Sequence, residues 1–150
     1  MTLASVSFLV RCVHVVAVAV ALGGSTMVAV AATHPEVPRD GGVFGLLVSY
    51  ERLFWIALGV IAMTGVGNLG AFGAGLPGAD TLWGRRLTLK LSLVVGLVVL
   101  SLVRTAFVAR IRNAGTLPSE TGWRIVRGFY ELTAATMGAI LVVALTLAHA

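Results

Sequence analysis

One histidine in this sequence is placed where its chemistry needs an explanation. His14 lies inside the apolar run RCVHVVAVAVALGG at residues 11–24. An imidazole at such a position can bind a transition metal or serve as an axial ligand of haem iron. It can equally form a hydrogen bond to a neighbouring carbonyl or hydroxyl group and bind nothing. We therefore predict His14 as a candidate ligand for haem b or copper, and a purely structural role stays open.

The other two histidines do not supply a second ligand at the same depth. His34 falls in a polar connection, and His149 is the penultimate residue. A haem held by His14 would therefore need a second ligand that is not a histidine, five-coordinate iron, His149, or another subunit.

A lysine and an arginine share one face of another apolar segment. Lys90, Leu97 and Arg104 recur every seven residues, so a helix places them on one side. Ser101 lies close to the same line. Lys90 is nearer the end of its segment, where its long side chain can reach the interface or turn inward toward His14. We predict that this face looks into a helical bundle, and we include Lys90 with His14 as a candidate cofactor-binding residue.

Charged side chains inside apolar segments are costly in a membrane, so they are expected to pair or to serve a function. Five of them fall near one predicted membrane surface, and we predict that they form a structural ion-pair network: Glu51, Arg52, Arg104, Arg127 and Glu131. The alternative is a proton or ion path between Glu131 and Lys90.

Other common site chemistries have no basis in this sequence. It contains no HExxH, GxSxG, P-loop or GxGxxG motif and no nucleic-acid motif. Cys12 is the single cysteine and has no partner for a disulfide. Three methionines that might bind Cu(I) fall at different depths, so we predict core packing for each of them: Met27, Met63 and Met137. We predict no catalytic residue, and an enzymatic activity is not favoured.

The elements that carry these residues are membrane spans. The chain has 150 residues, of which 58% are hydrophobic and 11% charged, and its mean hydropathy is +0.99. Such a composition predicts a membrane protein, with the lipid bilayer as its partner. Four apolar stretches each approach or exceed the roughly 20 residues that span a hydrocarbon core as a helix, at about 5–31, 43–67, 87–108 and 125–147. We predict an all-α bundle of four transmembrane helices that forms a single domain over residues 1–150.

Three further features bear on this arrangement. The first stretch ends in AVAVAAT, which resembles a signal-peptide cleavage region, but its polar front is unusually long and we interpret it as a span. Lys and Arg are more frequent on the side of the first and third connections, which predicts that both termini face outside. Small residues spaced three or four apart predict close packing between helices: Ala17, Ala21, Gly24, Gly59, Gly65, Ala134 and Gly138.

Four segments, in order, resemble the copper-resistance D (CopD) family. VHVVAVAVALGG is similar to the family's LHxxAxxxWxGG opening, with Ala21 in place of the Trp, and YERLFWIALGVIAMTGVGNLG resembles its second helix. TLWGRRLTLKLSLVVGLVVLSLVRTAFVARIRN is similar to its TxYGRxLLxKLxLV stretch with the following basic turn. WRIVRGFYELTAATMGAILVVALTL resembles its final helix. The related HemJ family of protoporphyrinogen oxidases shares the pattern of a first-helix His and a third-helix Lys, here His14 and Lys90.

The resemblance implies a four-helix membrane bundle associated with copper transfer, as in CopD proteins, or with haem b bound through the first-helix histidine, as in HemJ-like ones. The expected function is thus that of a small CopD-like protein in the bacterial cytoplasmic (inner) membrane, with a copper or haem site that is vestigial or completed by a partner. The alternative is a non-catalytic accessory subunit, without a cofactor, that packs against a larger membrane redox or energy-converting complex.

Overall fold

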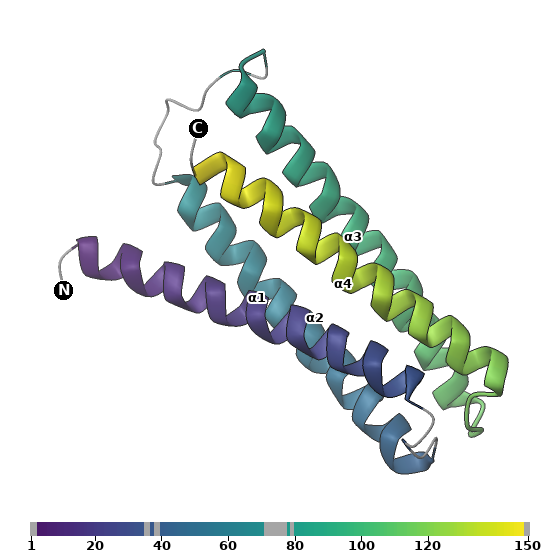
Figure 1. Ribbon diagram of the computed structural model, residues 1–150. Coiled ribbons are helices and arrows are strands. Elements are labelled where there is room, and N and C mark those ends of the chain that lie inside the picture. The colour runs from purple at the N-terminus through teal and green to yellow at the C-terminus, as the bar shows by residue number, and fades with distance from the viewer. Residues whose placement is uncertain (1–2, 35–36, 38–39, 71–77, 79, 149–150) are drawn as a thin grey trace.

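The chain folds into four long helices. The computed structural model describes residues 3–34, 37, 40–70, 78 and 80–148, and these residues contain four helices and no strand. The helices are α1 (Leu3–Thr33), α2 (Gly41–Gly70), α3 (Leu82–Asn113) and α4 (Glu120–Ala148), shown in Figure 1. All four are long and apolar enough to cross a membrane. The predicted all-helical fold with four spans is therefore confirmed, and the protein is an integral membrane protein.

Each helix is longer than its apolar stretch predicts. The hydrocarbon core selects only about 20 residues, whereas the polar residues on either side can continue the same helix. The differences reach five residues at both ends of α3 and at the start of α4, and α3 begins at Leu82 instead of the predicted position 87. The hydroxyl of Thr81 caps this end by accepting a hydrogen bond from the amide of Gly84 at 3.0 Å. A Thr in this position satisfies one of the amides that a helix start leaves without a partner.

Side-chain caps and one glycine also define the other connections. Asp40 Oδ1 accepts from the amide of Val43 at 3.0 Å, and Ser119 Oγ accepts from that of Gly122 at 3.1 Å. After α3 the chain turns at Gly115, whose φ of +66° is a conformation that favours glycine. These local signals fix where α2 and α4 start.

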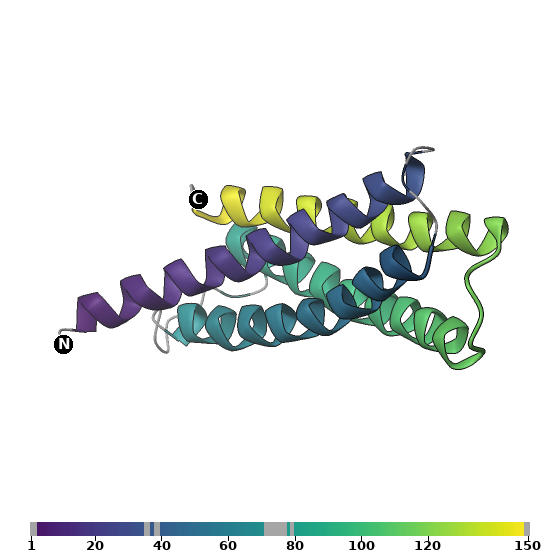
Figure 2. The same cartoon turned by 90° about the horizontal axis from the view of Figure 1, so that it is seen from below.

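The four helices alternate in direction around the bundle. We call the end where α1 and α3 end and α2 and α4 begin the connection end, and the opposite end, where α1 begins and α4 ends, the terminal end (Figures 1 and 2). Helix α1 packs against α2 and α4, and α3 packs against α4. Helices α2 and α3 barely touch, so the seam between them is the open side of the bundle.

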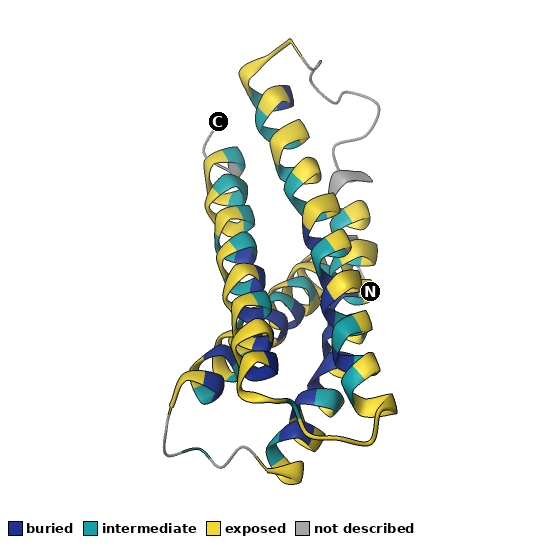
Figure 3. Cartoon of the chain, turned by 90° about the vertical axis from the view of Figure 1, so that its right-hand side faces the viewer, coloured by how far each residue is buried: buried dark blue, intermediate teal, exposed yellow. Residues whose placement is uncertain are grey.

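The packed core lies toward the connection end. Its buried residues on α2 lie between Phe44 and Leu58, and those on α4 lie between Gly122 and Met137. Along α1, no residue with a described side chain before Ala17 is buried. Figure 3 shows most of the buried segments in one half of the bundle, and buried Gly84 at the start of α3 is an exception. The terminal half is consequently loose, and Figures 1 and 2 show the first half of α1 diverging from α4.

The prediction of close packing at small residues holds in part. A Cβ at Gly24 would collide with the ring of Tyr50, so a glycine is needed for α1 and α2 to approach there. At Gly59 and Gly138 an added Cβ would meet nothing within 4 Å, and no close approach depends on either. These two glycines lie on surfaces that the described part of the bundle leaves open.

The prediction of core packing for the methionines is wrong for two of the three. Met137 is buried, but Met27 is 70% exposed and Met63 78% exposed. Both lie on outward faces of their helices. Because lipid is as apolar as a protein core, hydrophobicity alone does not distinguish a lipid-facing residue from a buried one.

Candidate functional site

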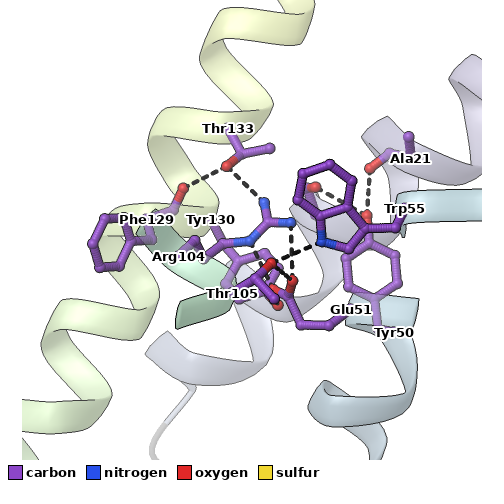
Figure 4. Close-up of polar contacts among 10 residues, drawn as sticks. Ala21, Tyr50, Glu51, Trp55, Arg104, Thr105, Phe129, Tyr130 and Thr133 are labelled. Atoms are coloured by element: carbon purple, nitrogen blue, oxygen red, sulfur yellow. Dashed lines mark hydrogen bonds and ion pairs between the residues drawn. The ribbon is translucent and has the colours of Figure 1, made fainter. Parts of the chain in front are cut away.

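A buried ion pair joins α2 to α3 in the packed half of the bundle. Arg104 Nε donates to Glu51 Oε1 at 2.7 Å, and Arg104 Nη2 lies 3.5 Å from Oε2 (Figure 4). Arg104 is 0% exposed and Glu51 5% exposed. Charges so far from water are stable only when they are paired and hydrogen-bonded, so the contact also holds together two helices that otherwise barely meet.

Hydroxyl groups from two helices complete the coordination of this pair. The carboxylate of Glu51 accepts from the hydroxyls of Tyr130 and Thr105, each at 2.5 Å. Arg104 Nη1 donates to Thr133 Oγ1 at 2.8 Å, and Thr133 in turn donates to the carbonyl of Phe129. The carboxylate therefore receives donors from α3 and α4, and the cluster connects three helices.

Aromatic rings surround the guanidinium group. Its carbon lies 4.2 Å from the ring centroid of Phe54 and 4.5 Å from that of Tyr130, within the range of cation–π attraction. Trp55 Nε1 donates to the Thr105 hydroxyl at 2.9 Å and so orients this hydroxyl, which itself donates to Glu51. The arrangement is saturated with donors, which is typical of a structural cluster.

The predicted ion-pair residues divide between this cluster and the surface. Glu51 and Arg104 lie together in the core. Arg127 Nε donates to Glu131 Oε1 at 2.7 Å in a separate pair along α4, with side chains 46% and 49% exposed. Arg52 is exposed and lies outside the Glu51–Arg104 cluster.

Sequence reasoning missed the hydroxyl and aromatic members of the cluster. Tyr130 and Thr133 are three residues apart on α4, and Glu51 is followed three residues later by Phe54, so each pair shares one helix face. Leu97 and Ser101 on α3 are buried together with Arg104, as predicted for their shared face. Such spacing was the available signal, but it does not tell which hydroxyl meets which charge.

His14 lies in the loose terminal half, against α2. Its Nδ1 is 2.7 Å from Thr64 Oγ1, and this hydroxyl donates its hydrogen to the carbonyl of Val60 at 2.6 Å. A hydroxyl has one hydrogen to give, so when Thr64 donates to Val60 its oxygen accepts from His14 and the proton of a neutral imidazole sits on Nδ1. In this arrangement the lone pair of the imidazole is on Nε2.

Lys90 is near His14 without packing directly beside it. It is half-buried on α3, and its charge acts on the imidazole, although α1 and α3 do not pack against each other. No group of three or more His, Cys, Asp or Glu residues that could hold a metal ion occurs among the described residues. His34 is exposed after the end of α1, Cys12 is exposed, and His149 lies outside the described residues.

An apolar groove of about 350 Å³ runs between α1 and α2. Val13, Val16 and Ala17 line it from α1, and Ile56 and Val60 from α2. The carbonyl of Val60 also accepts the hydrogen bond from Thr64, and Thr64 is the residue that contacts His14. The groove therefore lies beside the part of α2 that contacts His14.

The chain was compared with models of protein families, with curated proteins and with solved structures, and none of the three comparisons gave a match. The functional argument therefore depends on the geometry of these residues.

Proposed function

We propose that this chain is a small CopD-like membrane protein in which His14 is one ligand of haem b or copper, with the coordination completed by a partner. The observation that carries the proposal is the hydrogen bond between Nδ1 and Thr64, which leaves the lone pair on Nε2 when the Thr64 hydroxyl donates to Val60. Metal-binding histidines commonly donate their other ring nitrogen to a fixed acceptor, which orients the ring and selects the tautomer.

The donor set fits a single-imidazole site. One neutral histidine suffices as the proximal ligand of haem, and His14 meets this requirement within the chain. Cu(I) prefers several soft ligands, so a copper site here would draw further ligands from another protein. When bound, the group would supply electron transfer or metal transfer, while this chain would position the imidazole and exclude water around it.

The loose packing of the terminal half supports completion by a partner. His14, Thr64 and Lys90 are each only half-buried, and α1 exposes large apolar side chains in the same half, with Phe8 70% and Val15 64% exposed. A second polypeptide packed there would bury these groups and could contribute a ligand. The same surface also favours the second candidate function, an accessory subunit that packs against a larger redox or energy-converting complex and binds no cofactor.

The proposed setting is the bacterial cytoplasmic membrane, with both termini outside. Its support is the arginine-rich connection end, where Arg110, Arg112 and Arg124 are exposed. Cytoplasmic connections of membrane proteins carry such an excess of basic residues.

The test is a mild-detergent purification of the full chain from its native membrane, analysed by visible absorption, metal content and mass spectrometry of co-purifying proteins. A Soret band or stoichiometric copper that is lost in His14→Ala supports ligation. Stoichiometric association with a redox complex, with unchanged haem and copper in His14→Ala, supports the accessory subunit and removes the ligand role.

A second variant tests the hydrogen bond itself. Thr64→Val keeps the side-chain shape but removes the acceptor for Nδ1, and we expect affinity for haem or copper to fall by roughly 10- to 100-fold. Thr136→Val is the matched control, because Thr136 is half-buried like Thr64 and its hydroxyl donates within its own helix, to the carbonyl of Leu132. Equal affinities in the two variants would show that Thr64 does not position the imidazole.

A further inference from the structure

The open seam between α2 and α3 contains a groove lined in part by arginine side chains. It has a volume of about 150 Å³ and lies beside the Glu51–Arg104 cluster. Its walls are apolar, formed by Val48 and Trp55 from α2 and by Val108 and Ala109 from α3. Two arginines, Arg52 and Arg112, also line the groove, and both are exposed.

The positive charge of this groove is not cancelled within the described part of the chain. Glu51 is the acidic residue in the lining, but its carboxylate is already bonded to Arg104, Tyr130 and Thr105. Neither Arg52 nor Arg112 forms an ion pair among the described residues. Arg112 reaches the neutral side chain of Asn113 at 3.5 Å. Two guanidinium groups thus face one groove and lack a counter-ion.

The depth of Arg52 in its helix favours an anionic partner. Arg52 is the twelfth residue of α2, about 16 Å from the helix start at 1.5 Å per residue. The helix is about 45 Å long and the hydrocarbon core about 30 Å thick, so a centred helix places Arg52 some 9 Å inside the apolar layer. An exposed cation there is costly unless it extends toward the interface and meets a phosphate. Arg112, in the last turn of α3, marks where that interface lies along the same groove.

We infer that the groove between α2 and α3 binds one anionic phospholipid, with its phosphate on Arg52 and Arg112 and an acyl chain along Val48, Trp55 and Ala109. Basic pockets between transmembrane helices suit anionic headgroups, and the apolar walls suit the chain. The lipid would fill the one side of the bundle that the helices leave open. This inference is independent of any ligand at His14.

Native mass spectrometry of the purified full chain tests it, with phosphatidylglycerol and phosphatidylcholine supplied as an equal mixture. We expect one phosphatidylglycerol to be retained per chain, with a preference on the order of tenfold, because each arginine near the membrane surface attracts the anionic headgroup. Arg52→Gln/Arg112→Gln should abolish the preference. Arg110→Gln should keep it, because Arg110 is exposed on the same turn of α3 but does not line the groove.

Three outcomes would overturn the inference. Equal retention of both lipids by the wild type would make the groove a general acyl-chain surface. Unchanged phosphatidylglycerol retention in the double variant would place the lipid elsewhere. A lipid-free dimer that dissociates in the double variant would show that a second copy of the chain covers the groove.

Trp55 provides a second measurement in a bilayer, because its ring lines the groove. In a Trp83→Phe/Trp123→Phe background, brominated phosphatidylglycerol should quench its fluorescence more strongly than brominated phosphatidylcholine at the same mole fraction. Equal quenching by the two lipids would contradict the inference.

Discussion

Removing the buried arginine should be among the most destabilising single changes in this protein. Arg104→Met introduces an unbranched, apolar side chain of related length and leaves the carboxyl group of Glu51 buried without its counter-ion. Its carboxylate would retain the hydroxyls of Tyr130 and Thr105 and lose its only opposite charge in the cluster. Breaking a buried pair in this way costs on the order of 3–5 kcal/mol in the free energy of unfolding.

A double-mutant cycle separates the pair from the loss of packing. Glu51→Gln keeps the shape of the side chain but removes the negative charge and replaces one acceptor oxygen with an amide donor. Alone it leaves Arg104 buried without its opposite charge. In Glu51→Gln/Arg104→Met neither charge remains. We therefore expect the free energy of unfolding to fall by at least ~2 kcal/mol less than the sum of its decreases in the two single variants. The control pair is Arg127 and Glu131, whose side chains are 46% and 49% exposed; its disruption should cost about 0.5 kcal/mol or less.

The assay is reversible unfolding of the full chain in mixed micelles with increasing denaturing detergent, followed by near-ultraviolet circular dichroism. Losses below about 1 kcal/mol for Arg104→Met, comparable with the exposed control pair, would refute the reasoning. Strict additivity in the cycle would also refute it, because it would mean that Glu51 and Arg104 do not depend on each other.

Two further changes probe the contacts around this cluster by the same unfolding assay. Gly24→Ala places a Cβ against the ring of Tyr50 and should cost ~1–3 kcal/mol, as overpacking does. Gly59→Ala is its control, since nothing lies within 4 Å of the added Cβ, and it should be neutral or slightly stabilising. An equal loss in both would remove the claim of close approach at Gly24. Tyr130→Phe keeps the ring over the guanidinium but loses the hydroxyl donor to Glu51, and it should cost ~1.5–3 kcal/mol. A loss as large as that of Arg104→Met would mean that the hydroxyl, not the opposite charge, holds the carboxylate.

The number and type of the elements could be predicted from the sequence because the bilayer imposes a length on them. A stretch of about 20 apolar residues must close its own backbone hydrogen bonds in lipid, so a helix follows directly. The ends were less predictable. The extension of α3 to Leu82 depends on a Thr81 cap, and polar residues such as Arg85 and Arg86 continue the helix past the apolar run.

The side chains that meet inside the bundle were only partly predictable. The inward face of α3 followed from the seven-residue spacing, and burial of Leu97 and Arg104 confirms it. The pairing of Glu51 with Arg104 depends on how α2 and α3 are rotated about their axes, which hydropathy does not encode. The exposure of Met27 and Met63 has the same origin, since lipid and protein interior are alike for an apolar side chain.

The two polar regions of the bundle differ in a way that bears on function. Around Glu51 the charged groups are hydrogen-bonded to each other and to hydroxyls and are covered by aromatic rings. This cluster is therefore not available to bind a ligand. At His14 one ring nitrogen is hydrogen-bonded to Thr64, which leaves the other nitrogen for a ligand, in a half of the bundle that is loosely packed. The proposal depends on this arrangement. One half of the bundle is stably packed and holds the helices together, and the loosely packed half carries His14 as a candidate ligand.

Chemical rescue at His14 tests that proposal most directly. Purified wild-type chain and His14→Gly, with the co-purifying partner where there is one, are titrated with ferric haem and separately with Cu(I), each with and without added imidazole. We expect wild type to bind one of the two groups, His14→Gly to lose that binding, and free imidazole to restore it by occupying the vacated position. Binding that is equally strong in His14→Gly without imidazole would contradict a ligand role for His14.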